Sequence, residues 1–280
     1  MNFLYDLKEN FKREATSFHK MDDKTMFYAG LIILFNIVYL VAHSRHMFQG
    51  LEFISNRWLN IIVFTLVSLA FLYVLRHHLY KTVSFTPKKL GKSVIYANII
   101  FMASYFLYGS YNYIMHFFST KMSGDVQHIR QMAKIDWETY GTLVLRYVVS
   151  LLNEELLIIA VFLIILSLFK TSKVKYTLFA MFASLFFFAF LHMVSWNPQT
   201  IPAVMVSKMP ACLMFICLKD IKPLYLAHLF NNSWVALVTV EGMTGAIKNE
   251  VAMVFLLPCI LYAIYCIICH NMYQNPQEEK

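Results

Sequence analysis

Charged residues are scarce in this sequence. Aspartate, glutamate, lysine and arginine together make up 14% of its 280 residues, whereas soluble domains average about 25%. Apolar residues reach 59% and fall in runs long enough to cross a bilayer as helices. This composition excludes an ordinary soluble domain. It predicts an all-α integral membrane protein with about eight transmembrane helices.

Cysteines are also few, and their apolar surroundings do not suit a disulfide framework. The five cysteines all lie in apolar runs. Cys266 and Cys269 have CxxC spacing without a second pair, so we interpret them as packing residues rather than zinc ligands. The sequence also shows no repeats, low-complexity tracts or long linkers, and we see no cleavable signal peptide. The sequence therefore predicts a single membrane-embedded bundle.

The apolar runs predict the organisation of the chain. Spans are expected at about 26–43, 58–75, 93–118, 142–169, 175–195, 200–217, 222–240 and 250–269. We divide the chain into an interfacial amphipathic segment (1–25), three amino-terminal spans (26–118), an external loop (119–141), a four-span core (142–240), and a last span with a cytoplasmic tail (241–280). The first segment places Phe3, Leu7, Phe11, Ala15 and Phe18 on one helical face.

Positive charge is distributed unevenly between the connecting segments. Sixteen lysines and arginines lie in one alternate set of segments and six in the other, which predicts that both termini are cytoplasmic. The net charge of +8 comes from residues that flank spans, and it predicts contact with anionic lipid rather than with nucleic acid.

Several polar residues lie inside the predicted spans, where a charged group costs about 2.5–3.5 kcal/mol on insertion scales. Residues of this kind usually face the bundle interior and mark a functional site. His228 and Asn232 are four residues apart and share one helical face. The full set is Arg146, Glu154, Glu155, His192, Lys208, His228 and Asn232.

The order of these residues resembles a known family. Glu154-Glu155, then Phe188 to His192, then His228 to Asn232 are similar to the EExxxR, FxxxH and HxxxN patterns of the CPBP family, which includes the CAAX prenyl proteases and the bacteriocin-processing Abi peptidases. The resemblance covers about residues 140–240. It implies a CPBP-type helical core, the fold of the type II CAAX endopeptidases. It also implies an intramembrane peptidase. The lysine- and phenylalanine-rich composition suggests a bacterial plasma membrane, where members of this family process leader peptides or confer bacteriocin self-immunity.

One position departs from the family pattern. The arginine of EExxxR should stand at position 159, and this sequence has Ile159. Two adjacent carboxylates at low dielectric need a nearby cation, and Lys208 and Arg146 are the candidates to supply it. The alternative interpretation is a non-catalytic scaffold or regulator that keeps the fold without the chemistry.

The residues themselves suggest a mechanism of peptide hydrolysis. Glu154, hydrogen-bonded to His192, would activate a water molecule, His228 and Asn232 would stabilise the oxyanion, and Glu155 would orient its neighbours. The substrate would be a membrane-associated protein or peptide. Zinc held by Glu154, His192 and His228 is the alternative. The sequence has no HExxH pattern, so we favour a mechanism without a cofactor. Counting from the span ends places His228 at a different depth from Glu154 and His192, so the turn before His228 must be recessed, or the helices shortened or tilted.

Overall fold

The computed structural model of the chain describes residues 2–44, 57–79, 87–118, 134–169, 171, 173–192 and 201–241. These residues confirm the predicted all-α class. The helices found within them are α1 (Asn2–Thr16), α2 (Asp23–Ser44), α4 (Arg57–Val74), α5 (Pro87–Phe118), α7 (Trp137–Ser167), α8 (Val174–His192), α9 (Ile201–Leu218) and α10 (Lys222–Leu237). Each of the first seven predicted spans corresponds to one helix from α2 to α10. The eighth, at 250–269, lies outside the described residues.

Several of these helices carry the signature of membrane spans. Within the described ranges, α2, α5, α7, α8 and α9 contain segments long and apolar enough to cross a bilayer, and α4 contains a shorter apolar helix. On α8, phenylalanines at helical spacing form an outward stripe in which each side chain is about half exposed: Phe179, Phe182, Phe186 and Phe190. An apolar stripe that faces outward suits lipid rather than water.

Helix α7 is the central element of the bundle. It packs against α2, α4, α8 and α10, and an almost continuous stretch of its second half is buried. Its amino terminus is capped by Asp136, whose Oδ1 accepts a hydrogen bond of 2.7 Å from the Thr139 N–H. Hydrogen bonds from the Thr139 side chain and backbone lower the pKa of Asp136. The cap explains why α7 begins at Trp137, ahead of the predicted span start at 142.

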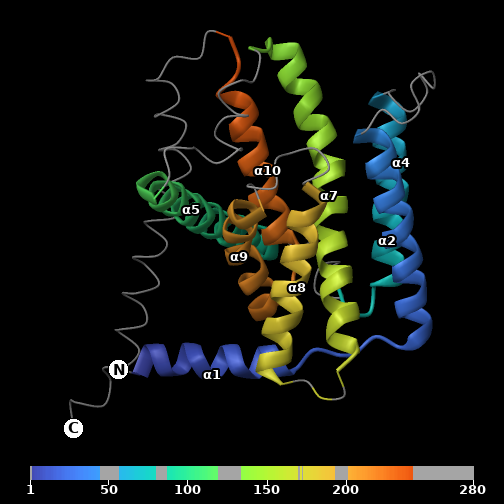
Figure 1. Cartoon of the computed structure of the whole chain (residues 1–280), viewed down its shortest axis with the longest axis vertical. Coiled ribbons are helices and arrows are strands. Elements are labelled where there is room, and N and C mark those ends of the chain that lie inside the picture. Colours follow the sequence, from blue (N-terminus) through green and yellow to red (C-terminus); the bar gives the residue numbers. More distant parts are fainter. Residues whose placement is uncertain are drawn as a thin grey trace.

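Helix α1 lies across one end of the bundle, nearly perpendicular to the long helices (Figure 1). Ala15 of α1 and Phe18, two residues after the helix ends, are buried. The Ala15 carbonyl accepts a hydrogen bond of 2.7 Å from Thr177 on α8, and Glu14 forms a 3.1 Å ion pair with Lys219 in the turn between α9 and α10. The α9–α10 turn therefore sits behind α1, inside the bundle. A recessed turn is one of the arrangements that would bring His228 to the depth of Glu154.

A buried pair of amides joins α2 to α7. Asn36 and Asn153 are each 1% exposed, and they exchange two side-chain hydrogen bonds of 3.2 and 3.1 Å. Reciprocal pairing satisfies a donor and an acceptor of each amide at once. A polar group left unpaired in hydrocarbon is costly, so the pair fixes the register between these two helices.

We expect Asn36→Leu and Asn153→Leu each to destabilise the protein in detergent, because either change leaves one buried amide without its partner. The double variant should recover part of the loss. Hydrogen bonds between membrane helices average about 0.6 kcal/mol and reach about 1.7 kcal/mol, so the coupling energy should fall in this range. Equilibrium unfolding of the four proteins of a double-mutant cycle measures it. A coupling energy indistinguishable from zero would contradict the assignment.

Candidate functional site

Three polar side chains from three helices meet at the centre of the bundle. Glu155 on α7, Lys208 on α9 and His228 on α10 form one cluster. The Lys208 ammonium donates a hydrogen bond to Oε1 of Glu155. Nδ1 of His228 lies 2.7 Å from that oxygen and 2.7 Å from Nζ of Lys208. The Glu155 side chain is 2% exposed and Lys208 is 12% exposed, so this is an internal ion pair with a histidine bound to both partners.

Glu154 lies on the other side of the same imidazole. Oε2 of Glu154 is 3.9 Å from Nε2 of His228, and the Glu154 side chain is 30% exposed. The two adjacent glutamates therefore differ sharply in their surroundings. Glu155 is enclosed by protein groups, whereas Glu154 is open to an incoming molecule.

Two tautomers of His228 fit the positions of its ring nitrogens. Because an ammonium only donates hydrogen bonds and a carboxylate only accepts them, the neutral ring either donates its Nδ1–H to Glu155 or accepts at Nδ1 from Lys208. In the second case the ring proton is on Nε2, the nitrogen that faces Glu154. In this arrangement Lys208 donates to both Glu155 and His228, and the three groups together carry no net charge.

His192 ends α8 beside this cluster. Its Nδ1 lies 2.9 Å from the Phe188 carbonyl oxygen. Because a carbonyl only accepts, Nδ1 carries the proton and Nε2 of the neutral ring remains an acceptor. The ring also stacks edge-on against Phe188 at 4.4 Å between centroids, and Lys208 Nζ lies 5.4 Å from the centre of the Phe188 ring. The hydrogen bond expected between His192 and Glu154 stays a prediction, and His228 is the histidine placed next to Glu154.

Asn232 lies one helical turn beyond His228 on α10. Its Oδ1 accepts a hydrogen bond of 3.1 Å from the side-chain amide of Asn231. This contact uses the acceptor of the Asn232 side chain and leaves its NH₂ group as a donor. Asn232 is only partly exposed.

The two candidate cations occupy different places. Lys208 forms the ion pair with Glu155. Arg146 lies in the first half of α7, where its guanidinium interacts electrostatically with Glu154 and with the phenol of Tyr39 on α2. In the part of the chain that the structure describes, no carboxylate lies within ion-pair distance of Arg146. Lys208 is therefore the cation that balances the buried carboxylate.

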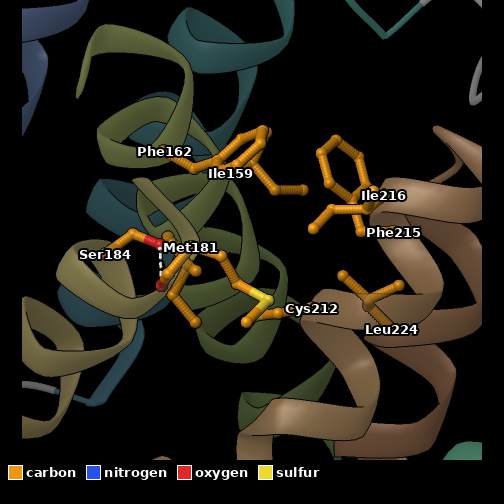
Figure 2. A pocket seen from close by; sticks show the side chains of 9 residues that line it. Ile159, Phe162, Met181, Ser184, Cys212, Phe215, Ile216 and Leu224 are labelled. Atoms are coloured by element: carbon orange, nitrogen blue, oxygen red, sulfur yellow. Dashed lines mark hydrogen bonds between the residues drawn. The ribbon is translucent and has the colours of Figure 1, made fainter. Parts of the chain in front are cut away.

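A small apolar cavity of about 10 Å³, the room of roughly one water molecule, lies next to the cluster (Figure 2). Ile159 and Cys212 face it. Ile159 is one helical turn after Glu155, and Cys212 is one turn after Lys208. The remaining lining residues are Ile158, Phe162, Met181, Ser184, Phe215, Ile216 and Leu224. An arginine at position 159 would point into this space, from which its guanidinium could reach Glu155.

The donor atoms of the cluster do not suit a metal between Glu155 and His228. A divalent cation there would need the Glu155 oxygen and the Nδ1 of His228, and the Lys208 ammonium already contacts both atoms. Among the described side chains, no three histidine, cysteine, aspartate or glutamate residues are grouped to hold a metal ion.

The sequence analysis missed two features: the Asn36–Asn153 pair and the apolar cavity. Asn36 and Asn153 are buried polar residues in spans, so their polarity could have revealed the pair. The cavity beside Ile159 and Cys212 had no signal, because apolar residues in an apolar helix carry no pattern that marks a void.

Comparison with known proteins agrees with the fold and the order of polar residues. Residues 136–234 match the family described as type II CAAX prenyl endopeptidase Rce1-like, and this segment contains all seven polar residues singled out above. No curated protein and no solved structure matches the chain. The match covers a little over a third of the chain and runs from the cap of α7 into α10. This match supports the predicted resemblance of this segment to the CPBP family of helical membrane proteins.

Proposed function

We propose that this protein is an intramembrane endopeptidase of the CPBP type. It would hydrolyse a peptide bond of a membrane-associated protein or peptide with a water molecule activated by glutamate. The observation that carries the proposal is the position of His228: its Nδ1 lies 2.7 Å from both Glu155 Oε1 and Lys208 Nζ, while its Nε2 faces the more accessible Glu154. A buried, oriented histidine opposite an accessible carboxylate is an arrangement suited to acid–base catalysis.

Glu154 is the proposed general base. In the first step the water oxygen bonds to the carbonyl carbon while a water proton passes to Glu154, which produces a tetrahedral oxyanion. In the second step the carbon–nitrogen bond breaks and the same proton passes from Glu154 to the leaving nitrogen. His192, with the acceptor Nε2 implied by its contact with the Phe188 carbonyl, is proposed to orient the water.

His228 and Asn232 are the proposed oxyanion donors. We propose that His228 carries its ring proton on Nε2, the nitrogen that faces Glu154; the NH₂ group of Asn232 follows one turn later on the same helix. Donors fixed before the reaction stabilise charge that develops in the transition state, and one such donor contributes about 10²–10³ in rate.

Glu155 and Lys208 are proposed to position His228 rather than to touch the substrate. Lys208 would take the part of the arginine that the family pattern places at position 159. Its side chain starts from α9 instead of α7 and reaches the same carboxylate. Ile159 would then mean that the positive charge has moved from position 159 to Lys208, and not that peptidase activity has been lost.

The mechanism is proposed to need no metal ion, because Lys208 supplies the positive charge at the point where a metal would contact Glu155 and His228. We therefore expect peptidase activity to be unchanged, within about twofold, after treatment with a strong chelator and dialysis. Added zinc should not stimulate it. Loss of activity on chelation with recovery by zinc would favour the alternative zinc site at Glu154, His192 and His228.

The membrane setting of the proposed reaction follows from the charge distribution. We propose that both termini are cytoplasmic and that the basic segments contact anionic lipid, as the excess of lysine and arginine on alternate segments predicts. Two substrate classes fit the family: a prenylated CAAX-type peptide, and the leader peptide of a bacteriocin-like product in a bacterial plasma membrane. The first can be synthesised directly and is the better probe.

The decisive assay uses the purified full chain in vesicles containing anionic lipid, with a fluorogenic prenylated CAAX-type peptide and a panel of leader peptides. Asn232→Ala removes one oxyanion donor and should lower kcat/KM by about 10²–10³. Ser233→Ala, the neighbouring change on α10, is the matched control and should leave the rate unchanged. An equal effect of both variants would argue against a specific role for Asn232.

A further inference from the structure

An aromatic layer closes the end of the bundle that α1 crosses (Figure 1). Phe18, in the linker after α1, packs edge-on against Phe162 at 5.2 Å between ring centroids and lies 6.0 Å from Phe215. All three residues are at most 9% exposed. Phe162 is two helical turns after Glu155 on α7, and Phe215 is two turns after Lys208 on α9. The layer therefore lies between the polar cluster and the membrane face at which α1 lies.

Polar contacts hold the linker against this end of the bundle. The Met21 N–H donates a hydrogen bond of 2.9 Å to Oγ of Ser167 at the end of α7. Lys219, which pairs with Glu14, also places its ammonium 5.0 Å from the centre of the Phe18 ring. The segment is thus tied both to α7 and to the α9–α10 turn, so the closed end is part of the packed fold.

Two residues of the candidate site lie far from this closed end. Glu154 is thirteen residues before Ser167 on α7, which is about 20 Å at 1.5 Å per residue. Thr177 of α8 contacts α1, and His192 is fifteen residues farther along α8, about 22 Å away. The hydrocarbon core of a bilayer is about 30 Å thick. With α1 at one membrane surface, Glu154 and His192 lie in the half of the membrane remote from α1.

The amino-terminal part of α7 has the composition of a membrane interface. Trp137 is 60% exposed and its ring contacts that of Tyr140 at 5.7 Å, and the partly exposed Arg146 follows. Aromatic and basic residues gather where a span meets the head groups. The stretch from Arg146 to Ser167 covers about 32 Å, close to the thickness of the hydrocarbon core. Glu154, about 12 Å from Arg146, is therefore nearer to this second face.

The accessible groups of the site belong to the same half of the bundle. The Glu154 side chain is 30% exposed, whereas that of Glu155 is 2% exposed. Asn232 is partly exposed and lies on α10, which runs away from α1. The end of α10 meets the start of α7, since the Ile135 N–H donates a hydrogen bond of 3.2 Å to the Thr239 carbonyl. The exposed groups thus lie on the side of the cluster away from the aromatic layer.

We propose that water and the substrate reach Glu154 from the membrane face opposite α1, and that α1 and its linker seal the other face. This inference rests on the proposed peptidase function and adds the face at which the substrate is presented. The charge distribution places the termini, and with them α1, on the cytoplasmic side, so the opposite face is external. The substrate class is then a peptide segment at the outer surface of the membrane, such as a translocated leader peptide, and not a lipid-modified protein of the cytoplasmic leaflet.

The test measures access from each face with cysteine reporters in the full chain. Glu138→Cys, in the exposed first turn of α7, marks the face opposite α1, and Thr16→Cys, exposed at the end of α1, marks the α1 face. Glu154→Cys and Asn232→Cys report on the site. Right-side-out and inverted membrane vesicles of a bacterial host carrying each variant are treated with a charged, membrane-impermeant thiosulfonate. Mass mapping identifies the labelled position, so the native cysteines are kept.

We expect both site reporters to be labelled in the right-side-out vesicles, together with Glu138→Cys. Their labelling should be lost in the inverted vesicles, in which Thr16→Cys reacts. Labelling of the site reporters from the α1 face, from both faces or from neither face would each overturn the proposal. Asn232→Cys keeps the test decisive if Glu154→Cys does not fold. If Glu138→Cys reacts in the inverted vesicles instead, the assignment of an external substrate is wrong.

Cleavage gives a second, independent readout. A water-soluble fluorogenic leader peptide that cannot cross the bilayer is added to both kinds of vesicle, with Glu154→Gln as the control for host proteases. We expect cleavage that depends on Glu154 in the right-side-out vesicles alone, and cleavage in the inverted vesicles alone would overturn the proposal. Absence of cleavage in both, and in detergent, would contradict the proposed peptidase function. The labelling pattern would still show from which face Glu154 is reached.

Discussion

Replacing Glu154 by glutamine is expected to lower the rate of peptide cleavage by about 10²–10⁴-fold, the range for loss of a general base. Glutamine keeps the size and hydrogen-bonding capacity of the side chain but cannot take a proton from water. The change should act on kcat more than on KM, because Glu154 is proposed to accept a proton in the transition state. Initial rates with the fluorogenic prenylated peptide in vesicles measure the effect.

Glu138→Gln is the matched control for this experiment. Glu138 lies on the same helix, in the exposed first turn of α7, so its replacement should leave the rate unchanged. Thermal stability of Glu154→Gln in detergent should equal or exceed that of the parent, since the change removes a partly buried carboxylate from a span. If Glu154→Gln retained full activity, the glutamate would not be the base and a non-catalytic scaffold would be the better description.

Replacing Lys208 by methionine is expected to have the largest effect on stability. The change leaves Glu155, whose side chain is 2% exposed, without its cation. Removing one partner of a buried ion pair typically costs about 3–5 kcal/mol. Activity should also be lost, because Nδ1 of His228 loses the donor that keeps the ring proton on Nε2. Unfolding in detergent and cleavage rates together measure the two losses.

The second-site change Ile159→Arg tests whether Lys208 stands in for the arginine of the family pattern. In the Lys208→Met background, an arginine at 159 would enter the cavity beside Cys212 (Figure 2) and could pair with Glu155 one turn away. We expect it to restore at least part of both the stability and the activity. Ile159→Arg alone should lower both, because it buries a second cation beside Phe162 and Phe215.

An uncharged control variant shows whether rescue of Lys208→Met requires the positive charge at position 159. Ile159→Met is the control, since it fills the same cavity without charge and should not rescue Lys208→Met. If the double variant Ile159→Arg/Lys208→Met is no better than Lys208→Met, the two positions do not substitute for one another. Lys208 would then serve only to neutralise Glu155.

The sequence by itself determined the class of the protein and the candidate residues of the site. Long apolar runs must form helices in lipid, because every backbone group has to be paired within the segment. The helices from α2 to α10 accordingly fall where the runs lie. Polar residues in those runs stand out because each is expensive to bury, and this is why Glu154, Glu155 and His228 were identifiable without any structure.

Only the tertiary structure decided which of these side chains contact one another and which remain accessible. Which histidine approaches Glu154, which cation meets Glu155, and which glutamate stays accessible all depend on how α7, α9 and α10 face one another. Local sequence does not specify those faces. The α9–α10 turn likewise contacts α1 through Lys219 and Glu14, which are residues far apart in the chain. Helix periodicity fixes positions along one helix, whereas the distances between side chains on different helices are set by packing.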